Sequence, residues 1–141
     1  MAITQAMCTS FKKELLEAEH DFTADTFYIA LYTSSASMDA GVTAYTTTNE
    51  ASGTGYVAGG KALTVATDTP NSEGTTAFVS FNNISWASST ITARGALIYN
   101  SSKSNKAVAV LDFGSDKSSS SSTFTVTFPA SNQNSAIVRI S

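Results

Sequence analysis

The chain has 141 residues, the length of one ordinary domain, and 42% of them are apolar, which indicates a folded core rather than disorder. Only 13% are charged, the net charge is −3 at pH 7, and the sole adjacent basic pair is Lys12-Lys13, so no basic face for nucleic acid is expected. No apolar run is long enough to span a membrane, and the single cysteine, Cys8, excludes an intramolecular disulfide.

The first predicted element is an amphipathic helix over about residues 4–20. Met7, Phe11, Leu15 and Ala18 are spaced by four, four and three residues, so they share one helical face. The Lys and Glu residues lie largely off this face, and no Gly or Pro interrupts the segment. We expect Met7, Phe11 and Leu15 to pack on the rest of the domain or on a neighbouring subunit.

Two residues with reactive side chains belong to this helical segment. Cys8 is predicted to be a small buried apolar residue on the helix. His20 is the only histidine, so a Ser–His–Asp triad would have to use it. Its place at the predicted helix end, where exposed carbonyls favour a cation, indicates a structural role instead.

The next segments are a strand and a long polar loop. Residues 27–32 alternate Phe, Ile and Leu with Tyr, Ala and Tyr, which predicts a strand with two partly buried faces. Residues 33–60 are dense in Thr, Ser, Ala and Gly, and loops of this length are usually functional or disordered. A short strand near residues 42–47 is compatible with the pattern. The glycines of the loop precede no predicted helix, so they indicate bends with positive φ rather than a phosphate site: Gly53, Gly55, Gly59 and Gly60.

The second half of the chain reads as strand after strand, separated by turn signals. The predicted strands are Lys61–Ala66, Thr76–Phe81, Ile84–Trp86, Thr92–Tyr99, Ala107–Phe113, Thr123–Phe128 and Ala136–Ile140. With residues 27–32 this makes about eight short strands, which predicts one antiparallel β-sandwich domain over residues 1–141, jelly-roll-like or immunoglobulin-like. The serine run 118–122 is predicted to be a flexible hairpin tip.

Catalytic, cofactor and metal signatures do not emerge from the sequence. Nucleotide-binding glycine motifs, a nucleophile elbow and an HExxH motif are missing, and no pair of carboxylates is singled out for glycoside hydrolysis. Asp112 and Asp116 flank Gly114, which favours an ordinary turn over a calcium site. Trp86 is predicted to be core. We therefore expect a protein without enzymatic activity, cofactor or metal.

One buried ion pair is predicted. Arg94 lies in an apolar run and, by alternation, shares a strand face with Ala96 and Ile98, so a partner carboxylate is expected. The long loop holds two acids, Asp39 and Glu50, and Glu50 directly precedes the glycine-rich bend. We expect Glu50 to reach Arg94 and to pin the loop to the sandwich. The alternative is an exposed Arg94 that reaches water or a neighbouring subunit.

Several segments together resemble small proteins encoded in the structural modules of tailed bacteriophages. They are Met7 to Lys12, Phe27 to Thr33, Tyr45 to Glu50, Gly53 to Tyr56, Gly59 to Lys61, Thr92 to Asn100 and Leu111 to Gly114. The resemblance spans nearly the whole chain. It implies a virion protein that is made in the host cytoplasm and supplies no catalytic residue.

Three functions follow as expectations. The first is a capsid decoration (cement) protein, a homo-oligomer that binds the assembled major capsid protein; 42 Ser and Thr residues and few charges suit packing against protein. The second is a tail, neck or fibre-adaptor protein, present as a ring of six or twelve, whose helix docks in a partner's groove. The third is a carbohydrate-binding module or depolymerase, which would need an exposed aromatic patch or an acid pair.

Overall fold

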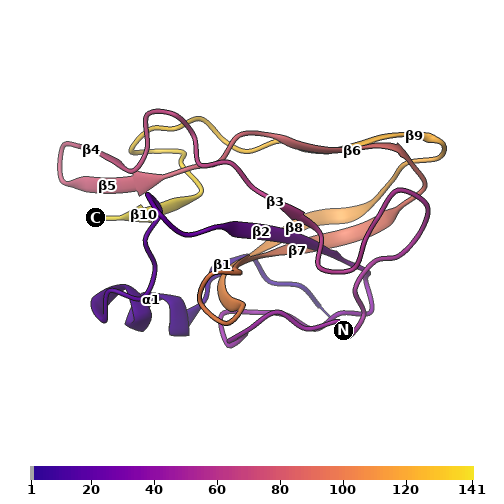
Figure 1. The fold of residues 1–141 in the computed structure, drawn as a ribbon, viewed down its shortest axis with the longest axis horizontal. Coiled ribbons are helices and arrows are strands. Elements are labelled where there is room, and N and C mark those ends of the chain that lie inside the picture. The colour runs from indigo at the N-terminus through magenta and orange to yellow at the C-terminus, as the bar shows by residue number, and fades with distance from the viewer. Residues whose placement is uncertain (1) are drawn as a thin grey trace.

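The computed structural model describes residues 2–141, which form antiparallel sheets and one short N-terminal helix (Figure 1). This confirms the predicted mostly-β, sandwich-like fold class, with ten strands where about eight were expected. In chain order the elements are β1 (Ala6–Met7), α1 (Thr9–Leu16), β2 (Phe27–Tyr32), β3 (Lys61–Ala62), β4 (Asn71–Glu73), β5 (Thr76–Val79), β6 (Ile84–Ser89), β7 (Thr92–Asn100), β8 (Lys106–Ser118), β9 (Ser122–Val126) and β10 (Val138–Ile140).

The strands form three sheets, and the largest has the order β1-β8-β7-β2-β3. Its central strands are apolar on both faces because both faces are covered, and residues 27, 29–32 and 95–100 are buried. Position 95 requires glycine because neighbouring residues approach its backbone closely. A Cβ there would lie 2.5 Å from the Leu111 carbonyl oxygen and 2.9 Å from the Ile3 side chain. The N-terminal residues therefore cross directly over β7.

A two-stranded sheet, β6-β9, runs alongside this large sheet, and the two are connected at one end of the molecule (Figure 1). β6 leads into β7 and β8 leads into β9 at the same end of the molecule, and the two connections are joined. There the backbone N–H of Ser119 donates to the Ile91 carbonyl (2.9 Å), and the Ser119 hydroxyl bonds that of Ser89 (2.8 Å). The predicted hairpin tip at residues 118–122 was wrong, because β8 and β9 belong to different sheets and Ser119 is buried.

The third sheet has the order β10-β5-β4 and lies at the end of the molecule that carries α1 (Figure 1). Strand β4 was not predicted, because its residues are polar and exposed and carry no alternation. Trp86, as predicted, belongs to the core, where it packs against Phe124 and Tyr56. No helix within residues 2–141 has the length and apolar character needed to cross a membrane.

The N-terminal helix is shorter than the predicted span of residues 4–20. Ala6 and Met7 pair with β8, and Cys8, the N-cap, is extended (φ −67°, ψ 138°). Met7 therefore lies on a strand, because a sheet ladder satisfies its segment better than an isolated helical turn does. At the other end Ala18 has φ 59°, and the N–H of Glu19 donates to the Glu14 carbonyl, which closes the helix.

The polar loop at residues 33–60 contains no strand and is held by isolated bridges, Tyr32 with Glu50 and Ala44 with Lys106. The predicted bends are confirmed, since Gly53, Gly55, Gly59 and Gly60 all have positive φ. Gly60 is also needed for contact, because a Cβ there would lie 1.7 Å from the Ile29 carbonyl oxygen. The glycines thus let the loop run against the sheet.

Candidate functional site: an apolar groove beside the N-terminal helix

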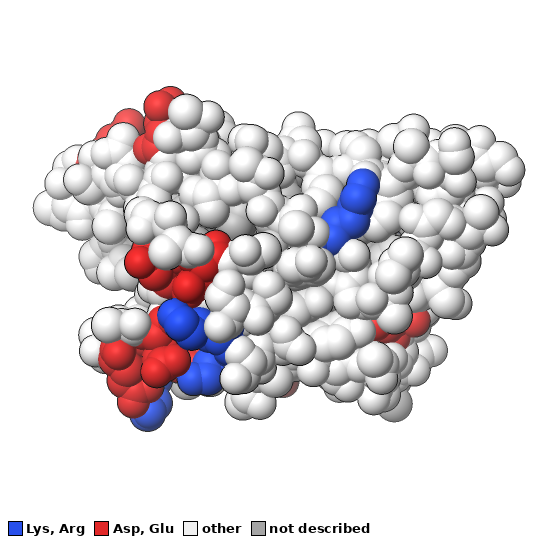
Figure 2. Space-filling view, in the orientation of Figure 1, with Lys and Arg blue, Asp and Glu red and all other residues white. Residues whose placement is uncertain are grey.

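Charged side chains gather at one end of the molecule, over α1 and the segments next to it, while most of the rest of this face is uncharged (Figure 2). The local sequence explains the cluster, since the helix and its exit supply Glu and Asp and the β7–β8 turn supplies lysines. Lys103 lies 3.1 Å from Asp25, and Lys106 lies 3.1 Å from Glu19. These pairs tie the helix exit to the turn of the main sheet.

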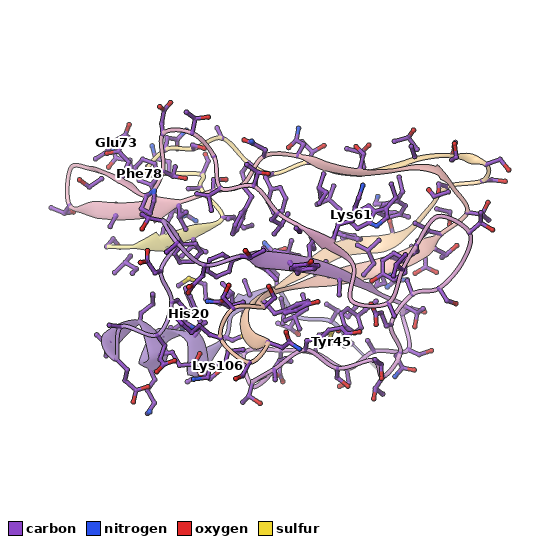
Figure 3. The ribbon with its side chains drawn as sticks, viewed as in Figure 1. His20, Tyr45, Lys61, Glu73, Phe78 and Lys106 are labelled. Atoms are coloured by element: carbon purple, nitrogen blue, oxygen red, sulfur yellow. The ribbon has the colours of Figure 1, made fainter. Side chains whose placement is uncertain are left out.

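His20 lies inside this end of the molecule, between α1 and the main sheet (Figure 3). Its ring packs on Phe11 and Phe27, with centroid distances of 4.9 and 6.3 Å. Nε2 lies 2.8 Å from the Glu14 carboxylate and Nδ1 lies 3.1 Å from the Asn100 amide nitrogen. His20 is therefore buried and links the helix exit to the main sheet.

The hydrogen bonds of Asn100 assign the His20 tautomer. The Asn100 side-chain oxygen accepts from the Ser102 N–H (3.0 Å), so its NH₂ group faces His20 and Asp25. Nδ1 must then accept a hydrogen bond, and the ring proton sits on Nε2, where it is donated to Glu14. Both imidazole nitrogens therefore form hydrogen bonds within the chain.

Asp25 and Glu19, the two acids that pair with lysines here, have lowered pKa values. Burial raises the pKa of Asp25, but hydrogen bonds from Asn100, from the Asp21 N–H and from Lys103 outweigh it, so the net pKa lies below the ordinary value. The hydrogen bond from Lys106 lowers the pKa of Glu19. Both carboxylates thus contribute to folding in their charged form.

An apolar groove opens beside this charged cluster, between α1 and the small sheet, and the surface is hollowed there (Figure 2). Leu15 and Phe22 line one wall, and the volume is about 110 Å³. The opposite wall is β-strand: Val138 and Ile140 alternate onto one face of β10, opposite Val79 and Ala77 of β5. We call this hollow, with Pro70 and Phe78 completing its lining, the apolar groove.

A few large apolar side chains are exposed, and one of them lines the groove. Within residues 2–141 three such side chains are exposed, Leu16 (91%), Val57 (73%) and Ile140 (53%). Ile140 lines the groove, and Leu16 follows the groove residue Leu15. Burying an exposed side chain of this kind against a partner is worth about 1.5–3 kcal/mol. The arrangement can bind an apolar side chain of another protein, and its lining offers no acid or base.

Glu50 organises a second cluster, on the long loop. Its carboxylate accepts hydrogen bonds from the hydroxyls of Tyr45 and Tyr56 (2.6 Å each) and from the Gly59 N–H (2.8 Å). The Tyr56 hydroxyl also accepts from the Leu31 N–H (2.9 Å), which links the cluster to β2. Burial, followed by the Glu50 hydrogen bonds, raises the pKa of Tyr45 and Tyr56. Glu50 does pin the loop to the sheet, as expected, although through tyrosines.

The predicted ion pair between Glu50 and Arg94 is not formed. The Arg94 Nε lies 2.9 Å from an Asp116 oxygen, and both side chains are more than a third exposed. The prediction was wrong because the β7–β8 ladder brings the distal half of β8 alongside Arg94, and Asp116 of that segment pairs with its guanidinium. An exposed pair of this kind contributes about 0–1 kcal/mol.

The other residues singled out from the sequence are placed as follows. Phe11 is fully buried in the core and Leu15 lies half-buried in the groove, whereas Met7 lines separate cavities beside β1. Cys8 is buried at the helix N-cap, and burial raises its thiol pKa to about 11. Asp112 accepts the Gly114 N–H (2.8 Å) at an irregularity within β8, so the turn predicted around Gly114 was wrong. In the described part of the chain, no three His, Cys, Asp or Glu side chains gather as a metal site would require.

The sequence did not identify the groove or the tyrosine cluster. Alternation within the predicted strand 136–140 does place Val138 and Ile140 on one face, so one wall of the groove was readable. The facing wall comes from residues more than a hundred positions earlier, and no local pattern relates the two. Comparisons of the chain with protein-family models, with curated proteins and with solved structures found no match.

Proposed function

We propose that this chain is a non-enzymatic structural component of a bacteriophage virion, a decoration protein that stabilises the capsid shell by packing against other virion proteins. The observation that carries the proposal is the apolar groove, whose lining includes the exposed side chain of Ile140. The sequence resemblance to phage structural proteins supplies the setting, and the major capsid protein is the expected partner.

The surface chemistry supports packing against protein. Ser and Thr make up 42 of the 141 residues, and neutral hydroxyls cost less to desolvate than charges do. The charges that exist are largely used within the chain, as in the pairs of Lys103 with Asp25 and Lys106 with Glu19. His20, the one histidine, is buried and held by Glu14 and Asn100.

Copy number separates this proposal from a tail or neck role. Purified virions are denatured and the chain is quantified by mass spectrometry against the major capsid protein. Hundreds of copies per particle are the expected result, as a decoration protein covers the shell. Six or twelve copies would place the chain in a tail or neck ring, and its absence from particles would refute a virion role altogether.

The groove is tested by a matched pair of surface variants. Ile140→Lys places a charge in the groove, whereas Val57→Lys places the same charge on an exposed apolar residue outside it. We expect both proteins to keep their melting temperature and only Ile140→Lys to lose binding to assembled shells. Equal binding of the two variants would mean that the groove is not the contact surface.

A further inference from the structure

Two cavities form a single groove between strands of different sheets. One has a volume of about 370 Å³ and is lined by Met7, Ile137 and Arg139, among others. The second, of about 230 Å³, is lined by Met7, Ile137 and residues of β8 such as Leu111. Because the cavities share Met7 and Ile137 in their linings, they lie next to each other. We call this groove, bordered by β1 and by the chain around β10, the β1–β10 seam.

The edge of β1 that faces away from β8 is open. Cys8 donates its N–H to the Val108 carbonyl (2.9 Å), and the preceding residue, Met7, stands opposite Ala109. Alternate residues of an antiparallel strand point their backbone groups to opposite sides. The N–H and carbonyl of Met7 therefore point away from β8, and within residues 2–141 no strand pairs with β1 on that side. The Met7 side chain lines the seam.

The edge of β10 is open as well. β10 pairs only with β5 and lies at the edge of its sheet. The backbone groups on its other side therefore pair with no strand in residues 2–141. Arg139 is the one charged residue that lines the seam, and its Nη1 donates to the Asn134 carbonyl (2.7 Å). The remaining guanidinium N–H groups leave Arg139 able to bind a carboxylate.

We propose that the β1–β10 seam accepts an extended segment of another virion polypeptide as an added β-strand. The segment hydrogen-bonds with Met7 on one side and with β10 on the other, and it joins the five-stranded sheet to the three-stranded one. This inference rests on the proposed virion function and names the kind of partner. Backbone bonds provide the affinity, while side chains facing Met7, Ile137 and Arg139 provide specificity.

The occupant is a flexible arm of a different protein. A strand inserted between two edges needs both of its own edges free, and each of the ten strands in residues 2–141 already pairs on at least one edge. No strand of a folded second copy of this chain therefore supplies it. We expect an apolar side chain of the arm to pack against Met7 and Ile137, and an acidic side chain close to it to pair with Arg139.

Site-specific photocrosslinking in assembled particles tests the proposal. Benzoylphenylalanine is placed at position 7, at position 137 or, as a control, at the exposed position 57, and the crosslinked peptides are identified by mass spectrometry. We expect positions 7 and 137 to crosslink to the same short segment of one other virion protein, a segment containing an acidic residue, and position 57 not to do so.

Other outcomes overturn the proposal. Crosslinks to a second copy of this chain, or to unrelated segments from the two positions, contradict an inserted arm. Particles that contain the chain at its normal copy number but give no crosslink refute the seam alone. A chain that is missing from particles refutes the proposed function together with the seam.

A charge reversal provides a second measurement. Arg139→Glu is compared with Lys117→Glu, an exposed lysine on β8 outside the seam. We expect Arg139→Glu to lower the number of copies per particle several-fold with little change in melting temperature, and Lys117→Glu to have no such effect. Equal copy numbers for the two variants would contradict a carboxylate beside Arg139.

Discussion

At the scale of single residues, Glu50 does more for the fold than any other charged side chain of the long loop. Three donors converge on its carboxylate, two of them phenolic hydroxyls at 2.6 Å. Hydrogen bonds to a charged acceptor are stronger than neutral ones. Glu50 therefore explains how a loop of Thr, Ser and Gly without strands keeps one path across the sheet.

Replacing Glu50 with Gln should destabilise the protein by about 1–3 kcal/mol, because the amide loses the charge and turns an NH₂ group toward hydroxyl donors. The matched control is Glu17→Gln, which removes only a solvent-exposed helical pair with Lys13. Urea denaturation followed by fluorescence measures both. Similar unfolding midpoints for the two variants would show that the cluster carries little free energy.

Tyr56→Phe should cost more than Tyr45→Phe, although each removes one hydroxyl from the same carboxylate. The Tyr56 hydroxyl also accepts the Leu31 N–H, which becomes unsatisfied in the variant. An unpaired buried N–H costs about 1–3 kcal/mol. Hydrogen exchange of the Leu31 amide should accelerate in Tyr56→Phe and stay unchanged in Tyr45→Phe, and the reverse order would contradict the assignment.

At the scale of elements, α1 is stabilised by packing rather than by its own length. Eight residues are too few for a stable isolated helix, and the N-cap residue makes no side-chain cap. Phe11 is fully buried against His20 and Phe22, whereas Leu16 projects into solvent with 91% of its surface exposed. One side of the helix thus belongs to the core and another to the outer surface.

Phe11→Ala should therefore lower the free energy of unfolding by about 3–5 kcal/mol, through lost burial and a cavity. Leu16→Ala, on the same helix and with a comparable loss of apolar volume, should change it by less than about 0.5 kcal/mol. Thermal unfolding monitored by circular dichroism distinguishes the two. A large effect of Leu16→Ala on the isolated protein would contradict its exposure.

At the scale of the whole molecule, ionisable groups limit stability on both sides of neutral pH. The pKa values of Glu19, Asp21 and Asp25 are lowered in the folded protein. Their contribution is complete above the unfolded pKa of about 4 and is lost as the pH falls through the lower folded values. Burial raises the pKa of Tyr45 and Tyr56, and that of Tyr99 to about 12.

Stability should accordingly form a plateau between about pH 5 and pH 9 and fall on both sides. The tyrosine contribution is complete below the unfolded pKa of about 10 and is lost as the pH rises through the higher folded values. Unfolding free energies measured from about pH 3 to about pH 12, together with the tyrosinate absorbance, check the loss of stability on both sides. If all tyrosines of the native protein titrated near pH 10, the predicted loss of stability at alkaline pH would be wrong.

The sequence by itself determined the elements whose signal is local. The alternation at residues 27–32 and 92–99 predicted β2 and β7 within a residue, and the 3.6-residue period located the helix and its buried Phe11. These succeed because burial on a strand or helix face repeats with the geometry of that element. Residue type alone predicted that Trp86 is a core residue and that Gly60 lies in a bend with positive φ.

Only the tertiary structure decided which distant groups meet. Glu50 and Arg94 were expected to pair, yet Glu50 bonds tyrosines and Arg94 bonds Asp116, because sheet order and register set the neighbours of each charge. Met7 fits the helical stripe but becomes a strand residue, since β8 offers it a ladder that helix propensity does not anticipate. The groove and the seam likewise join the two ends of the chain, and periodicity reports only which face is apolar, never what that face meets.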